Sequence, residues 1–217
     1  MKRPIIVKFG GSLLQQDNGD ILRSLGSILT QAASPLLVIP GGGPFADTVR
    51  HYGKQLDLSE ETCHFMALTA MDQYAFLLKE FMPGSEIIDL GNPFNPADTL
   101  NIPTTSANAK ILLCSRFLRQ LPSDDLLRSW DVTSDSIAAY LTRKINGAML
   151  VILKSKDINP KLQEPDVDPF FCRLLPLRIP VWFLNGMHPQ RLAELLQIGS
   201  TQGVYLAPGH TNAQFSV

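Results

Sequence analysis

The sequence Val7-Lys8-Phe9-Gly10-Gly11-Ser12 places a lysine and two glycines at the end of the first apolar run. Residues 5–9 are mostly β-branched or aromatic, which predicts a strand. Glycines after a strand let the backbone turn so that its N–H groups can face an anion. The stretch is therefore typical either of an ordinary strand followed by a glycine turn or of one part of a phosphate-binding site.

A second glycine loop, Pro40-Gly41-Gly42-Gly43-Pro44, follows a second apolar run at residues 35–39. The apolar residues at positions 21–29 have helical spacing, so the order strand, helix, strand predicts a parallel sheet. Pro44 suits the first turn of a helix, and we expect residues 45–52 to be helical. The loop would then form a second anion site at a helix N-terminus.

Residues 41–46 also match the dinucleotide fingerprint G-x-G-x-x-A, so a nicotinamide-binding protein is an alternative. That fingerprint normally follows the first strand of its unit, whereas here the first strand ends in Lys8 and its own glycines. An acidic residue at the end of the next strand, which would bind a ribose, is also missing. The Walker pattern is absent, which excludes an ordinary P-loop enzyme. Two glycine loops and a lysine suit phosphoryl transfer, in which anions meet in line.

The rest of the chain continues the alternation of strands and helices. A long helix is expected from Ser59, with Glu60 and Glu61 in its first turn, to the residues before Pro83. Further helices are expected over residues 136–144 and 189–196, and strands over residues 86–90, 111–113, 149–153, 180–184 and 203–206. We expect a polar loop at 13–19, a lid-like loop at 91–107, irregular structure at 115–128 and a surface excursion at 159–176.

Composition limits the classes of function. The 217 residues carry a formal net charge of -1, so no excess positive field attracts nucleic acid or anionic lipid, and we expect neither partner. Apolar residues make up 45% of the chain, enough for a sizeable core, but no run approaches the roughly 20 residues that span a bilayer. Three widely spaced cysteines without a C-x-x-C pair indicate neither a disulfide framework nor a zinc site. We expect a cytoplasmic protein without a metal site of its own.

Three segments together resemble the amino acid kinase family in their order and approximate spacing. They are residues 7–12, residues 40–44 and Asp131-Val132-Thr133-Ser134-Asp135, and residues 184–186 and 203–204 resemble the closing segment of that family. The resemblance implies a three-layer αβα sandwich on a mainly parallel sheet, formed by residues 1–217 as one domain. It also implies an acceptor-binding part at about residues 1–128 and an ATP-binding part at about residues 129–217, with Mg²⁺ held mainly by the nucleotide.

The resemblance also assigns roles to residues. Lys8 and Asp135 would be catalytic, the lysine holding the transferring phosphoryl group and the aspartate orienting the catalytic lysines, although Asp135 also suits a helix cap. The residues expected at the nucleotide are Gly10, Gly11, Ser12, Lys154, Lys156 and Asp157. The residues expected at the acceptor are Gly41, Gly42, Gly43, Asp47, Arg50 and Ser134.

The chain departs from the family at its second catalytic lysine. Family members carry it in a G-G-M-x-x-K segment after the nucleotide strand, and residues 158–184 contain no such segment. Lys154 or Lys156 can supply that charge, or both can belong to a solvated loop.

A sharper resemblance is to one branch of the family, the aminomethylfuran phosphate kinases of methanofuran biosynthesis. Residues 64–68, 70–73 and 129–138 carry it. The resemblance implies an acceptor with a phosphate and a primary amine, namely [5-(aminomethyl)furan-3-yl]methyl phosphate or an analogue. Asp47 and Arg50 are candidates to bind it, and a plain i,i+3 ion pair is the alternative. His51 and His64 are weaker candidates, because nothing in the sequence separates them from surface residues.

The leading hypothesis is an ATP-dependent kinase that acts on a small phosphorylated metabolite. A catalytically silent nucleotide-binding member of the family is the second, because the usual second lysine is missing. By analogy with related folds we also expect a homodimer or higher homo-oligomer.

Overall fold

The computed structural model describes residues 2–90, 109–122, 125–159, 166–176 and 178–209. Within these residues the strands form one seven-stranded sheet in the order β3-β4-β2-β1-β5-β6-β7. Neighbouring strands are parallel except β6 and β7, which are antiparallel. The strands are β1 (Ile5–Phe9), β2 (Leu36–Pro40), β3 (Glu86–Asp89), β4 (Ala109–Leu113), β5 (Met149–Lys154), β6 (Val181–Asn185) and β7 (Val204–Leu206).

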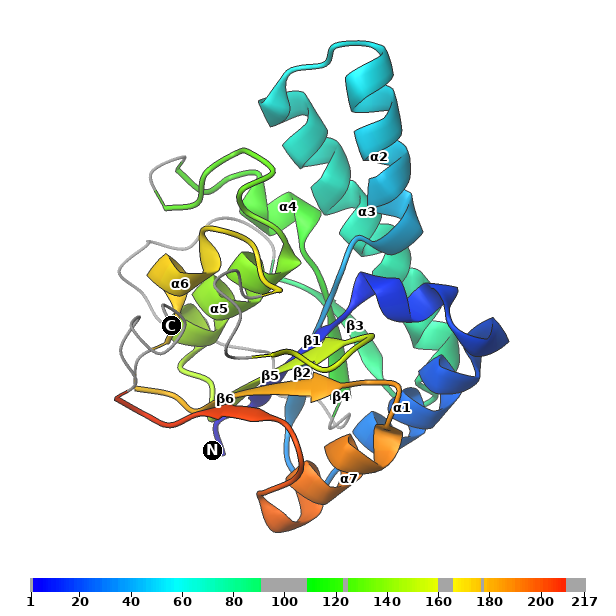
Figure 1. Cartoon of the computed structure of the whole chain (residues 1–217), viewed down its shortest axis with the longest axis vertical. Coiled ribbons are helices and arrows are strands. Elements are labelled where there is room, and N and C mark those ends of the chain that lie inside the picture. Colours follow the sequence, from blue (N-terminus) through cyan, green and yellow to red (C-terminus); the bar gives the residue numbers. More distant parts are fainter. Residues whose placement is uncertain (1, 91–108, 123–124, 160–165, 177, 210–217) are drawn as a thin grey trace.

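Helices cover both faces of this sheet, and α2 and the first turns of α3 project beyond it (Figure 1). The α-helices are α1 (Asp20–Thr30), α2 (Gly43–Gln55), α3 (Glu60–Phe81), α4 (Ser115–Leu118), α5 (Ser134–Ile145), α6 (Phe171–Leu174) and α7 (Pro189–Ile198). Two 3₁₀ helices, η1 (Gly11–Gln15) and η2 (Asp17–Gly19), lie between β1 and α1.

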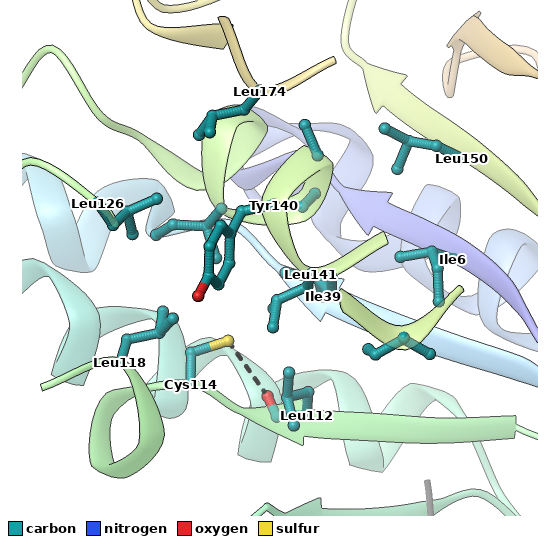
Figure 2. Close-up of a cluster of buried hydrophobic side chains, with 14 of the residues drawn as sticks. Ile6, Ile39, Leu112, Cys114, Leu118, Leu126, Tyr140, Leu141, Leu150 and Leu174 are labelled. Atoms are coloured by element: carbon teal, nitrogen blue, oxygen red, sulfur yellow. Dashed lines mark hydrogen bonds between the residues drawn. The ribbon is translucent and has the colours of Figure 1, made fainter. Parts of the chain in front are cut away.

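The two faces of the sheet bury two apolar clusters, because successive strand side chains point to opposite sides. Ile6 and Ile39 pack with α4, α5 and α6 on one face, the cluster that Figure 2 shows. Val7 and Phe9 pack on the other face with α1, α7 and the second half of α3. The expected three-layer αβα sandwich on a mainly parallel sheet is confirmed.

Three segments differ from the sequence prediction. The expected loop at 13–19 is largely occupied by η1 and η2. Residues 115–128 include the short helix α4, whose first N–H groups are bound by a carboxylate from α3: Asp72 Oδ1 accepts from the backbone N–H of Cys114 at 2.6 Å and of Ser115 at 3.1 Å. The expected surface excursion at 159–176 contains α6, whose Phe171 is fully buried. The predicted lid-like loop at 91–107 lies outside the described residues.

The order of the strands in the sheet indicates where a ligand would bind. The chain passes from β1 to β2 on one side of β1, whereas β5 lies on its other side. In sheets of this kind, ligands bind beyond the carboxyl ends of the strands at the point where the connection changes side. The residues that follow β1, β2 and β5 therefore meet at one edge of the sheet. No described helix is both long and apolar enough to cross a bilayer.

Candidate active site at the carboxyl edge of the sheet

A cavity of about 470 Å³ lies at this edge, which we call the carboxyl-edge cavity. Both glycine loops line it, together with the first turns of α2 and α5, the first half of α3 and the residues after β5. The sequence-predicted site residues that it brings together are Lys8, Gly11, Ser12, Gly42, Gly43, Asp47, Arg50, Ser134, Asp135, Lys154 and Lys156. Gly10, Gly41 and Asp157 do not line it.

The two glycine loops press against each other. A Cβ on Gly11 would lie 2.2 Å from the backbone nitrogen of Gly43, and a Cβ on Gly41 would lie 2.6 Å from the nitrogen of Gly11. Gly43 also has a φ of 52°, which favours glycine, and it begins α2, whose first N–H groups have no partner within the helix. The glycines are therefore needed for close packing that sets two runs of backbone N–H groups side by side.

Gly10 and Gly41 belong to the glycine loops but pack against the ends of the strands rather than lining the cavity. The N–H of Gly41 donates to the carbonyl of Phe9 at 2.8 Å. A Cβ on Gly10 would lie 2.4 Å from the carbonyl oxygen of Leu153. Both residues let the chain turn closely over the ends of the strands. Neither lines the cavity, so the structure gives no support to the ligand contacts predicted for them.

Two lysines converge on one buried aspartate in the first turn of α5. Lys8 Nζ lies 2.8 Å from Asp135 Oδ1, and Lys154 Nζ lies 2.5 Å from Asp135 Oδ2. The three side chains are 6%, 14% and 5% exposed for Lys8, Lys154 and Asp135, respectively. The Lys8 contact is an ion pair by distance but not an aligned hydrogen bond, since Oδ1 has no hydrogen-bond donor among the described residues.

Strand alternation brings the lysines together. Lys8 follows Ile6 by two residues and Lys154 follows Ile152 by two, and both isoleucines belong to the cluster under α5. Lys8 pairs with Ile152 in the sheet, so the two lysines lie on the same face of adjacent strands. Lys154, which the sequence analysis assigned to the nucleotide, thus shares its aspartate with Lys8.

Burial and the two lysines set the ionisation of this group. Burial lowers the pKa of Lys8, and Asp135 partly opposes that shift while Lys154 adds to it. Burial by itself would raise the pKa of Asp135, but the charges of Lys8 and Lys154 outweigh it and lower that pKa below its ordinary value. Asp135 is therefore an anion, and with both lysines protonated the three side chains carry one excess positive charge. A buried excess charge of this kind is stabilised by an anion.

A second aspartate, Asp168, fixes the start of α5, and sequence reasoning missed it. Its Oδ2 accepts from the backbone N–H of Thr133 at 3.0 Å, the Thr133 hydroxyl at 2.7 Å and the N–H of Ser136 at 3.1 Å. Its Oδ1 accepts from the Ser136 hydroxyl and from the N–H of Phe170 at 3.2 Å. Thr133 is itself the N-cap of α5, as its residue type predicts, and no local pattern points to the aspartate 35 residues away.

The residues after β5 divide between the cavity and the surface. Ser12 Oγ donates to Ser155 Oγ at 2.9 Å, which joins the first glycine loop to this segment. Lys156 lines the cavity, but it is 68% exposed and pairs with Asp166 at 3.2 Å. The structure therefore distinguishes the two lysines that the sequence left as alternatives: Lys154 joins the buried group and Lys156 does not.

Asp157 does not line the cavity. It accepts from Asn185 Nδ2 at 3.1 Å and from the guanidinium of Arg191, whose side chain is buried. The hydrogen bond from Asn185 and then that from Arg191 hold the pKa of Asp157 below its ordinary value. Asp157 connects the end of β5 to β6 and α7, so its predicted nucleotide contact has no geometric support.

Asp47 and Arg50 lie on α2 and both line the cavity. Arg50 Nη1 lies 2.8 Å from Asp47 Oδ1, so the i,i+3 ion pair exists and both residues also line the cavity. The Arg50 guanidinium lies over the ring of Trp130 at 4.4 Å from its centroid, which fixes the arginine beside the glycine loop.

His64, one of the two weaker candidates, is buried and lines the cavity, which separates it from the surface residues that the sequence could not distinguish it from. Burial lowers its pKa, although a hydrogen bond with the backbone of Ser129 acts in the other direction. His51 is exposed on α2 and does not line the cavity. The long helix α3 brings His64 inward, a placement that depends on packing rather than on local sequence.

Metal-ligating side chains do not gather in the described part of the chain: no group of three or more His, Cys, Asp or Glu residues there could hold a metal ion.

Comparisons with known proteins agree with this geometry. The sequence model of the Amino acid kinase family matches residues 3–158. The chain is 26% identical over 213 residues to the [5-(aminomethyl)furan-3-yl]methyl phosphate kinase of Methanocaldococcus jannaschii, covering 88% of this chain and 92% of that protein.

Two solved structures share the fold. Uridylate kinase from Archaeoglobus fulgidus has a TM-score of 0.65 at 15% identity, over 95% of this chain and 100% of that one. UMP kinase from Ureaplasma parvum has a TM-score of 0.61 at 15% identity, over 95% of this chain and 96% of that one.

Proposed function

The chain belongs to the amino acid kinase family and is a phosphotransferase, and on that premise we propose that it transfers the γ-phosphoryl group of ATP to a small phosphorylated metabolite. The acceptor that we propose is [5-(aminomethyl)furan-3-yl]methyl phosphate or an analogue. One observation carries the proposal: Lys8 and Lys154 meet at Asp135 beside two touching glycine loops.

The chemistry that such a group supports is charge stabilisation. In the transfer, an oxygen of the acceptor phosphate bonds to the γ-phosphorus while the bond from that phosphorus to the bridging oxygen of ADP breaks. Negative charge is spread over the phosphoryl oxygens in this transition state. Lys8 and Lys154 would offset that charge, and Asp135 would hold both ammonium groups in place so that little reorganisation is needed.

The glycine loops would supply the remaining hydrogen bonds. We propose that the N–H groups of Gly11 and Ser12 contact the phosphoryl oxygens at the nucleotide side and that those of Gly42 and Gly43 contact the acceptor phosphate. The direct packing of Gly11 on Gly43 supports this assignment, because it holds the two anion sites close together.

The two halves of the chain would divide the substrates. We propose that about residues 1–128 bind the acceptor and about residues 129–217 bind ATP, with Mg²⁺ held mainly by the nucleotide phosphates. Asp47 and Arg50 face the cavity from the first half, where a carboxylate suits an amine and a guanidinium suits a phosphate. Ser134 lines the cavity at the start of α5 and is a further candidate contact for the acceptor.

The cellular setting is also part of the proposal. The 26% identity to the archaeal aminomethylfuran phosphate kinase supports a role in methanofuran-type cofactor biosynthesis. The three cysteines are unpaired, which fits the reducing cytoplasm. We propose a homo-oligomer by analogy with related folds.

The test is multiple-turnover release of ADP from ATP and Mg²⁺ with a panel of phosphate monoesters. We expect one acceptor to support turnover, and Lys8→Ala to lower kcat by about 10²–10³-fold because a donor to the transition state is lost. Lys8→Met keeps the side-chain volume and separates loss of charge from loss of packing. The control is Lys110→Ala, which removes another buried lysine, on β4 and outside the cavity.

Equal turnover by Lys8→Met and the parent would overturn the assignment of Lys8. Nucleotide binding without turnover on any acceptor would favour the silent family member. The placement of Lys154 weakens that alternative, because the charge that the sequence analysis found missing is present at Asp135. The nicotinamide alternative is set aside by the family membership and by the packing of the Gly41–Gly43 segment on the first glycine loop.

A further inference from the structure

A second cavity of about 600 Å³ lies at the amino edge of the sheet, away from the carboxyl-edge cavity. It is lined by residues that precede β1 and β6, by the last turn of α5 and by α6, which lies beside α5 (Figure 1). Along α5, at a rise of about 1.5 Å per residue, Arg143 in the wall of this amino-edge cavity lies about 12 Å from Asp135. The amino-edge cavity is thus a separate site rather than an extension of the first.

Four arginines line the amino-edge cavity without an acidic neighbour. Arg3, Arg143, Arg173 and Arg178 contribute to the wall, and no Asp or Glu does among the described residues. Arg3 donates to Asn146 Oδ1 at 3.3 Å, and the guanidinium of Arg173 lies over the ring of Phe170, but in the described part of the chain none of the four forms an ion pair. The arginines that do contact a carboxylate are Arg23, Arg50, Arg116, Arg128 and Arg191.

Capping of the C-terminus of α5 does not account for these arginines. Basic side chains often lie at a helix C-terminus because they bind its last carbonyl groups. Here the N–H of Asn146 donates to the carbonyl of Arg143 at 3.2 Å and the N–H of Gly147 donates to that of Thr142 at 3.0 Å. Backbone groups thus satisfy two of the carbonyls that the arginines would otherwise cap. Four like charges in one hollow of a chain with net charge -1 repel one another unless an anion lies between them.

We propose that the amino-edge cavity binds a small anion with two or more phosphate groups. Guanidinium groups match phosphate oxygens by paired N–H donors, and the four of them around one cavity carry more positive charge than a single phosphate group offsets. The cavity volume is in the range that accommodates a small molecule. Nucleoside triphosphates and inorganic polyphosphates share this chemistry, and the experiment separates them.

Cys172 provides a readout that is independent of catalysis. It lines the amino-edge cavity and is partly exposed, whereas Cys63 and Cys114 are buried. The rate at which the neutral reagent iodoacetamide alkylates Cys172, followed by mass spectrometry of its peptide, reports whether the cavity is filled. Ligand binding at the carboxyl-edge cavity leaves this thiol uncovered.

The probes are inorganic tripolyphosphate and ATP without Mg²⁺, each at constant ionic strength. We expect tripolyphosphate at about ten times its dissociation constant to slow alkylation of Cys172 about tenfold. Protection by tripolyphosphate and ATP alike assigns a polyphosphate site, and protection by ATP alone assigns a nucleotide site. Protection by sodium chloride or sulfate to the same extent would overturn the proposal, because only general charge screening would then be at work.

The matched variants remove two arginines each. Arg143→Gln with Arg178→Gln should abolish protection, while Arg23→Gln with Arg116→Gln, which removes the same charge outside both cavities, should preserve it. All four side chains are exposed, so the variants should fold, and circular dichroism checks this. Protection that persists in the first pair overturns the proposal. So does alkylation that slows with protein concentration alone, because a second copy of the chain would then cover the cavity.

Discussion

The carboxyl-edge and amino-edge cavities are both cationic, but they hold their charges in different ways. In the first, Lys8 and Lys154 are buried and share the carboxylate of Asp135. In the second, four arginines are exposed and none pairs with an acid among the described residues. Helix α5 separates the two, with Asp135 in its first turn and Arg143 in its last.

The difference indicates what each arrangement can do. Charges fixed by a buried partner stay in place when charge develops on a reacting group, which is what catalysis needs. Exposed arginines reorganise at low cost and keep their charge at all physiological pH values, which suits binding of a ready-made anion. The buried lysines and their aspartate are part of the packed interior, whereas the exposed arginines lie on the protein surface. The predictions below test this contrast.

Among the tests of this contrast, the largest expected effect separates Lys154 from Lys156. Lys154→Ala should lower kcat by about 10²-fold, because it removes a buried charge next to Lys8. Lys156→Ala should change turnover little, since that side chain is exposed and its ion pair with Asp166 is weak. Steady-state ADP release with the acceptor that the phosphate monoester panel identifies measures both. Equal losses in the two variants would contradict the distinction between buried and exposed lysines.

Substitution of Asp168 should destabilise the protein, whereas substitution of the arginines that line the amino-edge cavity should not. Asp168→Asn should lower the free energy of unfolding by about 2–3 kcal/mol, because a charged acceptor of several hydrogen bonds is lost at the start of α5. Arg143→Gln with Arg178→Gln should stay within about 0.5 kcal/mol of the parent, as surface changes usually do.

Urea unfolding followed by circular dichroism gives both values. Asp131→Asn, whose side chain is exposed close to the start of α5, is the control for the loss of one acidic charge. A destabilisation by the arginine variants as large as that of Asp168→Asn would show that the amino-edge charges are part of the packing after all.

The smallest expected effect is a pH dependence from His64. Its pKa is lowered in the folded protein, so between that value and the unfolded value near 6.5 the unfolded chain binds more protons. This contribution to stability is fully present above pH 6.5 and is lost as the pH falls toward the folded pKa, by at most about 1.4 kcal/mol per pH unit. The arginines of the amino edge add no such dependence.

Unfolding curves measured from pH 7.5 downwards test the sign of this effect. His64→Gln should flatten the curve just below pH 6.5, and His51→Gln, at an exposed position on α2, is the control for the loss of a histidine. A steeper curve for His64→Gln would contradict the neutral, buried state of this histidine.

Much of the fold could be predicted because its signals are local. Continuous apolar runs predicted the strands, and Ser59 predicted the start of α3, where its hydroxyl accepts from the N–H of Thr62 at 3.2 Å. Helix α6 was missed because four residues are too short for helical periodicity to show. Its burial comes from contact with α5, which no local pattern encodes.

The candidate site divides in the same way. Lys8, Asp135 and the two glycine loops were found because short motifs carry them. Asp168 and the burial of His64 were missed because each depends on residues that are distant in the sequence. The choice between Lys154 and Lys156 was left open because the two positions, two residues apart, are equivalent in strand alternation. Only the structure shows that β5 ends at Lys154 and that Asp135 lies beside this lysine.

The sequence by itself determined the layered α/β architecture, the two glycine loops and the lysine at the end of the first strand, because hydrophobic periodicity and glycine's freedom to turn act over a few residues. Only the tertiary structure decided that Gly11 packs on Gly43, that Lys154 shares Asp135 with Lys8, and that four arginines line one cavity. Those features arise where strands and helices meet across long sequence separations, and there packing and electrostatics fix which side chains become neighbours.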